Sequence, residues 1–310
     1  MKKLMGILLT LCLLLGMMAV PAMAEEKPLV GILAPQATHG WLAALSYYAE
    51  NEAKAQDLNY KLYTYQSSAE AAGYIEELIG LNAKAIVAFP QAEGLEEATK
   101  MAIDAGIKVI NFDVKINVDG TYFLCGDNYG MGVESAKYIA EKLGGKGKVA
   151  ILTISTVSNV TTDRTQGFKD TLAEIAPEIE IVGEYAGNSW ARTDSVVAVG
   201  DMLTANPQLD AIFSLDDEAS IGALQAINEA GRTDIKVITG GGGCQEYFNM
   251  MKDSTIDLCS ALYSPSMMID CVQMAVKALN GEEIPAETTV PTAIVDKTNV
   301  DQYLDANAPY

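Results

Sequence analysis

Short hydrophobic runs alternate with helical patterns along the chain from residue 28 onward. In the first half, apolar runs predict strands at 28–34, 60–65, 85–89, 108–113 and 122–126. Between the first four, apolar residues three to four positions apart predict helices over 41–56, 68–80 and 93–105. The strands are continuously apolar rather than alternating, which is typical of a parallel sheet buried on both faces.

The same pattern then starts again. Strands are predicted at 148–154, 179–185, 211–216, 236–241 and 256–262, and helices at 163–174, 191–205, 217–230 and near 246–252. Because the two halves have similar spacing, the sequence predicts an α/β protein with two similar lobes, each a doubly wound parallel sheet. A chain of 310 residues also exceeds one comfortable hydrophobic core.

The first residues have the pattern of an export signal. Lys2 and Lys3 precede an apolar stretch, and Ala22-Met23-Ala24 has the small-x-small pattern of a cleavage site. We therefore expect a signal peptide over 1–24 and a mature protein that works outside the cytoplasm, in the periplasm where an outer membrane exists. No later segment approaches the roughly 20 apolar residues of a membrane-spanning helix.

Composition narrows the possible partners. The formal net charge of −20 predicts no binding to nucleic acid or to an anionic membrane surface. Beyond the signal peptide there are four cysteines, which are either buried free thiols or disulfide-bonded; four cysteines allow three full pairings. With one histidine and no C-x-x-C motif, we expect no metal and no cofactor.

Polar and aromatic residues gather where the predicted strands end. Ligands of open α/β sheets bind beyond the carboxyl ends of the strands. In this sequence those positions hold His39, Trp41, Gln91, Asp113, Trp190 and Asp216. Aromatic rings cover the C–H faces of a sugar, while carboxylates and amides bond its hydroxyl rim. The pattern therefore indicates a sugar or polyol site in which the two tryptophans, one in each half, sandwich a ring.

Several stretches together resemble the type 1 periplasmic solute-binding proteins, the ribose- and galactose-binding group that serves sugar ABC transporters. They are "GILAPQATHGWLAAL", "AIVAFPQ", "KVINFD", "CGDNYGMG", "RTQGF", "AIFSLDDEASIGALQAINEAG" and "NGEEIP". The resemblance implies a monomer whose two lobes close over one ligand and deliver it to a membrane permease. It also implies a three-segment hinge, with an N-terminal lobe of 25–127 plus 262–290 and a C-terminal lobe of 128–261 plus 291–310.

The resemblance assigns ligand contacts by position. It implies contacts from His39, Trp41, Asp113, Trp190 and Asp216, with Phe89 and Gln91 as further candidates. Arg164 of "RTQGF" either bonds the ligand or only holds the turn, since ribose-type members carry their ligand-binding arginine at the position of Thr162.

Two departures from the ribose-type pattern predict a ligand other than ribose. Val114 replaces an arginine, and the glycines of "TGGGGC" (239–244) stand where an aspartate is usual. Backbone N–H groups such as that of Gly241, or the side chain of Gln245, would then bond the ligand. The glycine loop lacks the lysine of a P-loop. A phosphate or carboxylate on the ligand stays possible, with Lys115 and Arg164 as its counter-charges.

Structural roles are the alternatives for these residues. Asp113, Asp127 and Asp216 are each able to cap a helix, and for Asp127 we prefer that interpretation. Trp41 is alternatively a core residue, and His39 alternatively caps its turn.

Two other functions stay open at this point. One is a sensor that presents a bound sugar-like signal, of the autoinducer type, to a chemoreceptor or sensor kinase. The other is an exported sugar hydrolase that uses Asp113 and Asp216 as its carboxylate pair. The lone histidine and the absence of a nucleophile motif argue against an enzyme.

Overall fold

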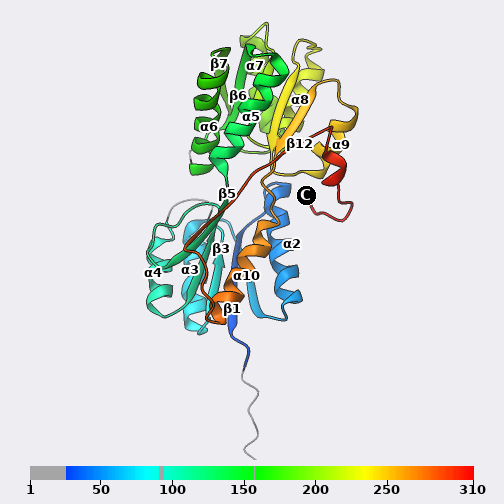
Figure 1. Cartoon of the computed structure of the whole chain (residues 1–310). Helices are drawn as coiled ribbons and strands as arrows, with labels where there is room; N and C mark the ends of the chain where they lie inside the picture. Colours follow the sequence, from blue (N-terminus) through cyan, green and yellow to red (C-terminus); the bar gives the residue numbers. More distant parts are fainter. Residues whose placement is uncertain (1–25, 91–93, 157) are drawn as a thin grey trace, which may run out of the picture.

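The computed structural model describes residues 26–90, 94–156 and 158–310, which form two α/β lobes stacked end to end (Figure 1). The predicted signal peptide and Gln91 lie outside the described residues. The first lobe is built on a parallel six-stranded sheet. Its strands, in spatial order, are β11 (Glu287–Val290), β5 (Thr121–Gly126), β4 (Lys108–Phe112), β3 (Ala85–Ala88), β1 (Leu29–Pro35) and β2 (Asn59–Tyr65).

The second lobe repeats this arrangement. Its sheet runs β12 (Ile294–Asp296), β10 (Asp257–Ala261), β9 (Val237–Gly241), β8 (Ala211–Ser214), β6 (Lys146–Ile154) and β7 (Glu178–Gly187). Only β12 pairs antiparallel among these strands. The predicted fold class, two similar doubly wound parallel sheets, is therefore confirmed. All four residues of β3 and of β8 are buried, as strands covered on both faces require.

Helices cover the sheets and connect successive strands. The first lobe carries α2 (Gly40–Ala55), α3 (Ser68–Gly80) and α4 (Glu96–Asp104), and the second carries α5 (Asn128–Leu143), α6 (Asn159–Ile175), α7 (Arg192–Ala205), α8 (Asp217–Glu229) and α9 (Gln245–Asp253). A 3-10 turn, η1 (Val300–Gln302), contacts α9. Among the described residues, no helix combines the length and the apolar character that a membrane span needs.

Side-chain caps set the start of two helices. The helix α5 begins at Asn128, because the Asp127 carboxylate accepts from the Gly130 N–H at 2.7 Å. The helix expected from 163 begins at Asn159, because Ser158 forms a capping box there. The cap role predicted for Asp127 is confirmed. Both helices therefore begin at an asparagine, Asn128 in α5 and Asn159 in α6, which hydrophobic spacing does not mark.

The chain passes between the lobes three times. It leaves the first sheet after β5 and returns to the first lobe after β10, where α10 (Met267–Leu279) packs against α2, β3 and β4. It crosses once more between β11 and β12. In Figure 1, α10 lies in the lower lobe among elements from the start of the chain. We propose lobe boundaries after residues 127, 261 and 290 on this basis.

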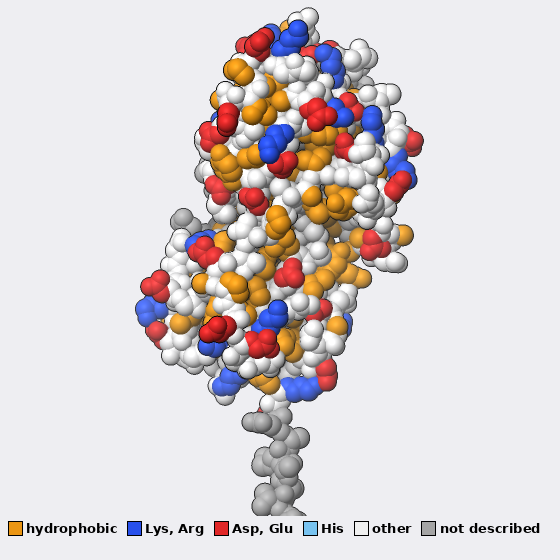
Figure 2. Space-filling model, viewed as in Figure 1, with side chains coloured by type: hydrophobic (Ala, Val, Ile, Leu, Met, Phe, Trp, Pro, Cys, Tyr) orange, Lys and Arg blue, Asp and Glu red, His pale blue; other side chains and the backbone are white. Residues whose placement is uncertain are grey.

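The composition led to expectations about surface charge and about the state of the cysteines, and the structure describes both. Figure 2 shows acidic and basic side chains interspersed over both lobes on the face in view. All four cysteines of the described chain are unpaired, so the free-thiol alternative is confirmed. Three of them are buried, whereas Cys125 is partly exposed.

Candidate functional site

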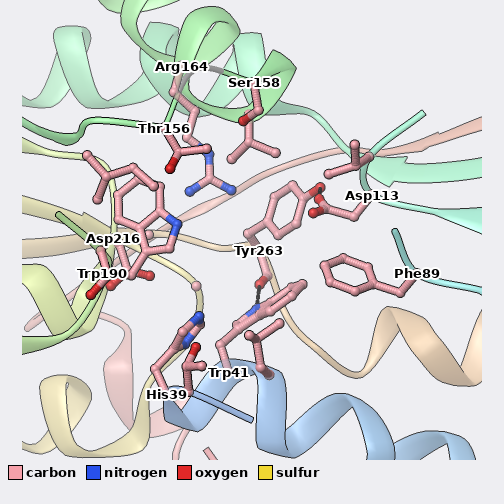
Figure 3. A pocket seen from close by; sticks show the side chains of 18 of the residues that line it. His39, Trp41, Phe89, Asp113, Thr156, Ser158, Arg164, Trp190, Asp216 and Tyr263 are labelled. Carbon is pink, nitrogen blue, oxygen red and sulfur yellow. Dashed lines mark hydrogen bonds between the residues drawn. The ribbon is translucent and has the colours of Figure 1, made fainter. Parts of the chain in front are cut away.

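A cavity of about 340 Å³ lies between the two lobes (Figure 3). The first lobe contributes Thr38, His39, Trp41, Leu42, Phe89, Asp113 and Val114 to its wall. The second contributes Ile154, Thr156, Ser158, Val160, Arg164, Asn188, Ser189, Trp190, Asp216, Gly241 and Gly242, and Tyr263 lines it from the crossing after β10. Most of these residues follow the carboxyl end of a parallel strand, where doubly wound sheets bind their ligands.

Aromatic rings form the first-lobe side of the cavity. Trp41 is buried and its indole Nε1 donates to the Tyr263 carbonyl oxygen at 2.9 Å. Its ring stacks on Phe112 with centroids 6.1 Å apart and lies 5.9 Å from Phe89. Trp41 is thus a core residue that also lines the cavity, and its contact with a ligand stays a prediction. Phe89 lies beside it in the wall.

Trp190 faces this side from the second lobe. It lies in the turn between β7 and α7, where the Ser189 hydroxyl donates to Asp194 at 2.6 Å and accepts from the Ala191 N–H at 3.2 Å. Trp190 packs partly against the core of its lobe. Figure 3 shows its indole across the cavity from Phe89. The two lobes therefore each present an aromatic ring to the space between them.

Asp113 is a buried carboxylate held in an unusual backbone conformation. Its φ is +66°, a region that favours glycine, and its side chain is 6 % exposed. The Tyr263 hydroxyl donates to its Oδ1. The pKa of Asp113 is raised above its ordinary value, because the effect of burial is larger than the opposing effect of the hydrogen bond from Tyr263. Asp113 begins no helix, so the cap interpretation is wrong for it.

Asp216 has two roles at once. Its Oδ1 accepts from the Ala219 N–H at 3.0 Å and so caps α8, and the same side chain lines the cavity. Burial, and next the neighbouring Asp217 carboxylate, raise the pKa of Asp216 to about 8. At neutral pH the side chain is therefore mostly protonated and offers an O–H donor as well as an acceptor.

The RTQGF stretch lies inside α6 rather than in a turn, and Arg164 extends from this helix to the cavity wall. Its Nε donates to Asn128 at 2.9 Å and its NH1 to the Leu215 carbonyl at 2.8 Å, while the guanidinium lies 4.7 Å from the Tyr263 ring centroid. Figure 3 shows the guanidinium pointing from α6 into the cavity. Arg164 therefore holds no turn. It links α6 to Asn128 at the start of α5 and to Leu215 after β8, and its guanidinium lines the cavity, whereas its bond to a ligand stays a prediction.

His39 stands directly before α2 without capping it, so the cap alternative is wrong. Its Nδ1 is buried and has no hydrogen-bond partner within the described chain. Burial lowers the pKa of His39 to about 4, so the ring is neutral at physiological pH. A neutral imidazole beside the cavity offers one donor and one acceptor to a hydroxyl.

The glycine loop already holds an anion of the protein itself. The Asp217 Oδ2 accepts from the Gly243 and Cys244 N–H groups at 2.7 and 2.9 Å and from the Ser260 hydroxyl at 2.9 Å. These are the donors that would cradle a phosphate at the start of α9. Gly241 lines the cavity as expected.

Two residues named from the sequence lie away from the cavity. Gln245 is not in its wall; its Nε2 donates to the Tyr303 carbonyl at 3.1 Å and its Oε1 accepts from the Asp305 N–H at 2.8 Å. Lys115 pairs with Glu287 on the surface, so its role as a counter-charge in the site is wrong. Gln91 lies outside the described residues.

Six polar wall residues were not assigned to the site from the sequence: Thr38, Thr156, Ser158, Asn188, Ser189 and Tyr263. They follow β1, β6, β7 and β10, so the strand-end rule applied to every strand would have included them. Among the described residues, no cluster of His, Cys, Asp and Glu has the makings of a metal site.

Comparison with known proteins agrees with this geometry. The model of the periplasmic binding protein domain family matches residues 30–283. The chain belongs to this family. The ribose import binding protein of Salmonella typhimurium is 26 % identical to this periplasmic binding protein over 283 residues, which cover 90 % of this chain and 94 % of the relative. The D-ribose/D-allose-binding protein of Pseudomonas aeruginosa is 26 % identical over 296 residues, covering 91 % and 92 %.

A solved structure gives the same result. An ABC transporter periplasmic solute-binding protein from Actinobacillus succinogenes, with bound D-allose, superposes with a TM-score of 0.82 at 26 % identity, covering 89 % of this chain and all of the other. The chain is thus a member of the sugar-binding component family of periplasmic ABC transporters, and it functions outside the cytoplasm. These relatives are named as binding proteins, so the protein is a binding protein rather than an enzyme, and no comparison favours the hydrolase alternative.

Proposed function

We propose that this protein captures a monosaccharide or a related polyol between its two lobes and delivers it to the permease of an ABC transporter. The observation that carries the proposal is the cavity itself. Both lobes present an aromatic ring to it, and carboxyl, hydroxyl, imidazole and guanidinium groups stand around these rings. A sugar needs this combination, because its C–H faces are apolar and its rim is a ring of donors and acceptors.

The names of the relatives favour the same ligand class. Besides the ribose and allose binders, a xylitol-binding protein from Mycolicibacterium smegmatis is 26 % identical over 237 residues. A sugar and an open-chain polyol both fit a volume of about 340 Å³. We propose a ligand other than ribose, because Val114 stands in the wall where the resemblance to ribose binders implies an arginine.

A thermal-shift screen of residues 25–310 tests the proposal. The panel would hold pentoses, hexoses, sugar alcohols and inositols, with amino acids of similar size as the control set. A compound at 100 times its dissociation constant stabilises the folded state by about 2.7 kcal/mol, a shift of several degrees. We expect at least one sugar or polyol to shift the melting temperature. A shift with amino acids alone would refute the sugar assignment.

Delivery to a permease needs its own measurement. We expect uptake of the radiolabelled hit compound to fall when the gene is deleted and to return with the wild-type gene. Uptake that is unchanged by the deletion, with binding established in vitro, would contradict transport and favour a sensory role.

A further inference from the structure

The segment from 299 onward returns from the second lobe to the gap between the lobes. Gln245 binds it at Tyr303 and Asp305, and Lys252 on α9 pairs with Asp301 at 2.7 Å. These contacts fix the segment to the second lobe. Figure 1 shows its end beside the start of α2, which belongs to the first lobe.

Tyr310 lies in this gap with its side chain 8 % exposed. A Cβ atom added to Gly40 would lie 3.0 Å from the Tyr310 ring, and one added to Gly242 would lie 2.9 Å from the Tyr310 hydroxyl oxygen. Gly40 begins α2 in the first lobe, whereas Gly242 follows β9 in the second and lines the cavity. The ring is therefore packed between the backbones of both lobes, and it fits because both positions are glycine.

A hydrogen bond between the lobes lies next to this ring. The Gly40 N–H donates to the Glu218 Oε1 of α8 at 3.1 Å. Gly40 is flanked by His39 and Trp41, which line the cavity. Tyr310 thus contacts a residue next to the first-lobe wall of the cavity and a residue in its second-lobe wall, so its ring helps to set the distance between the two walls.

The Tyr310 ring acts by packing rather than by its hydroxyl. That oxygen is buried and has no hydrogen-bond partner within the described chain. Burial, and next the Asp216 and Asp217 carboxylates, raise the pKa of Tyr310 well above its ordinary value, so the hydroxyl stays neutral. Phenylalanine would make the same apolar contacts.

We propose that Tyr310 is a positioning residue for ligand binding, whose ring fills the gap between the lobes and stabilises the arrangement seen here, in which both lobes line one cavity; we call this arrangement closed. Its relevance to capture rests on the proposed function. Removing the ring shifts the population toward open forms. The apparent dissociation constant rises in inverse proportion to the closed fraction, so a tenfold loss of closed protein weakens binding tenfold.

The first test is small-angle X-ray scattering from residues 25–310 without added sugar. Tyr310→Ala is expected to increase the radius of gyration, whereas Tyr310→Phe is expected to leave it at the wild-type value. Asn307→Ala is the matched control, because Asn307 is exposed in the same segment. Equal radii for Tyr310→Ala and wild type would overturn the proposal.

Hydrogen exchange separates opening from a damaged fold. In Tyr310→Ala, amides at the start of α2 and in the 241–244 loop should exchange faster, while β6 and β8 keep their protection. Faster exchange throughout the second lobe would mean a general loss of stability and would also overturn the proposal. Neither measurement needs a sugar. If the sugar screen fails, a larger radius of gyration in Tyr310→Ala would still support the role of Tyr310. If a sugar binds but Tyr310→Ala keeps the wild-type radius and exchange rates, only the role of Tyr310 is rejected.

Discussion

The Tyr263 hydroxyl donates to the Asp113 carboxylate although the two residues are 150 positions apart in the sequence. Tyr263 lies where the chain crosses back into the first lobe, and its carbonyl oxygen accepts from the Trp41 indole. One residue at the crossing therefore orients two first-lobe residues of the candidate site. Because the Asp113 Oδ1 is held by this bond, the carboxylate presents a fixed acceptor to the cavity.

Replacing Tyr263 with phenylalanine tests this relationship. The change leaves a buried carboxyl without its donor, which costs about 1–3 kcal/mol. We expect a lower melting temperature and roughly tenfold weaker binding of the sugar identified in the screen, measured by calorimetry. Tyr138→Phe is the control, since the Tyr138 hydroxyl bonds to Leu258 at 3.4 Å in the second lobe. Unchanged affinity in Tyr263→Phe would mean that Asp113 needs no such support.

Trp190 is the aromatic contribution of the second lobe to the cavity. Trp190→Ala removes an aromatic ring from the cavity wall, so on the proposed function we expect an affinity loss of about ten- to a hundredfold, or roughly 1.4–2.7 kcal/mol. The melting temperature without sugar should change by only a few degrees, because the side chain is partly exposed. Tyr47→Ala, an exposed aromatic on α2, should bind normally. Equal affinities in the two variants would remove Trp190 from the site.

Because the pKa of Asp216 is raised, we expect the free energy of unfolding to fall as the pH rises toward 8. Its folded pKa of about 8 lies above the ordinary 3.8, so the folded state holds a proton that the unfolded state releases. The resulting stability is lost as the pH rises toward 8. His39, with a folded pKa lowered from 6.5 to about 4, acts in the opposite direction below pH 6.5.

The informative window is therefore between about pH 6.5 and about pH 8.5. There the wild-type protein should lose at most about 2 kcal/mol of unfolding free energy, or a few degrees in melting temperature. Asp216→Asn should flatten this slope, since an amide does not titrate and still caps α8. A wild-type slope that persists in the variant would assign the titration to another group.

The sequence predicted five strands of each sheet, most clearly those that are buried on both faces and continuously apolar, but not the edge strands β11 and β12. Within each lobe, the carboxyl ends of parallel strands meet at a common edge, which brings together His39, Trp41 and Asp113 in one lobe and Trp190 and Asp216 in the other. That the two edges face one cavity followed from the resemblance and not from the order of the strands.

The errors came from side chains whose partners are distant in the sequence. Gln245 stands at the right strand end, but it turns to the segment at 303–305, whose path no local pattern predicts. Tyr310 likewise follows no periodic element, and its burial depends on two glycines from different lobes. Lys115 was assigned to the site by charge alone, whereas its partner is Glu287 on a neighbouring strand.

The glycine loop gives the last prediction, which concerns anionic ligands. The Asp217 carboxylate accepts from the N–H groups of Gly243 and Cys244 in this loop. A second anion would have to compete with Asp217 for donors already bonded. We therefore expect sugar phosphates and inorganic sulfate to leave the wild-type melting temperature unchanged at concentrations where the matching neutral sugar raises it.

Asp217→Ala provides the complementary arm. It leaves three donors without an acceptor, two of them buried and one part-buried, so its unfolding free energy should fall by about 3 kcal/mol. Sulfate should then restore part of the lost melting temperature, because the vacated donors at the start of α9 form an anion site. Asp217→Asn, which keeps one acceptor oxygen, should respond less. Stabilisation of the wild-type protein by sugar phosphates would show that the loop serves the ligand rather than Asp217.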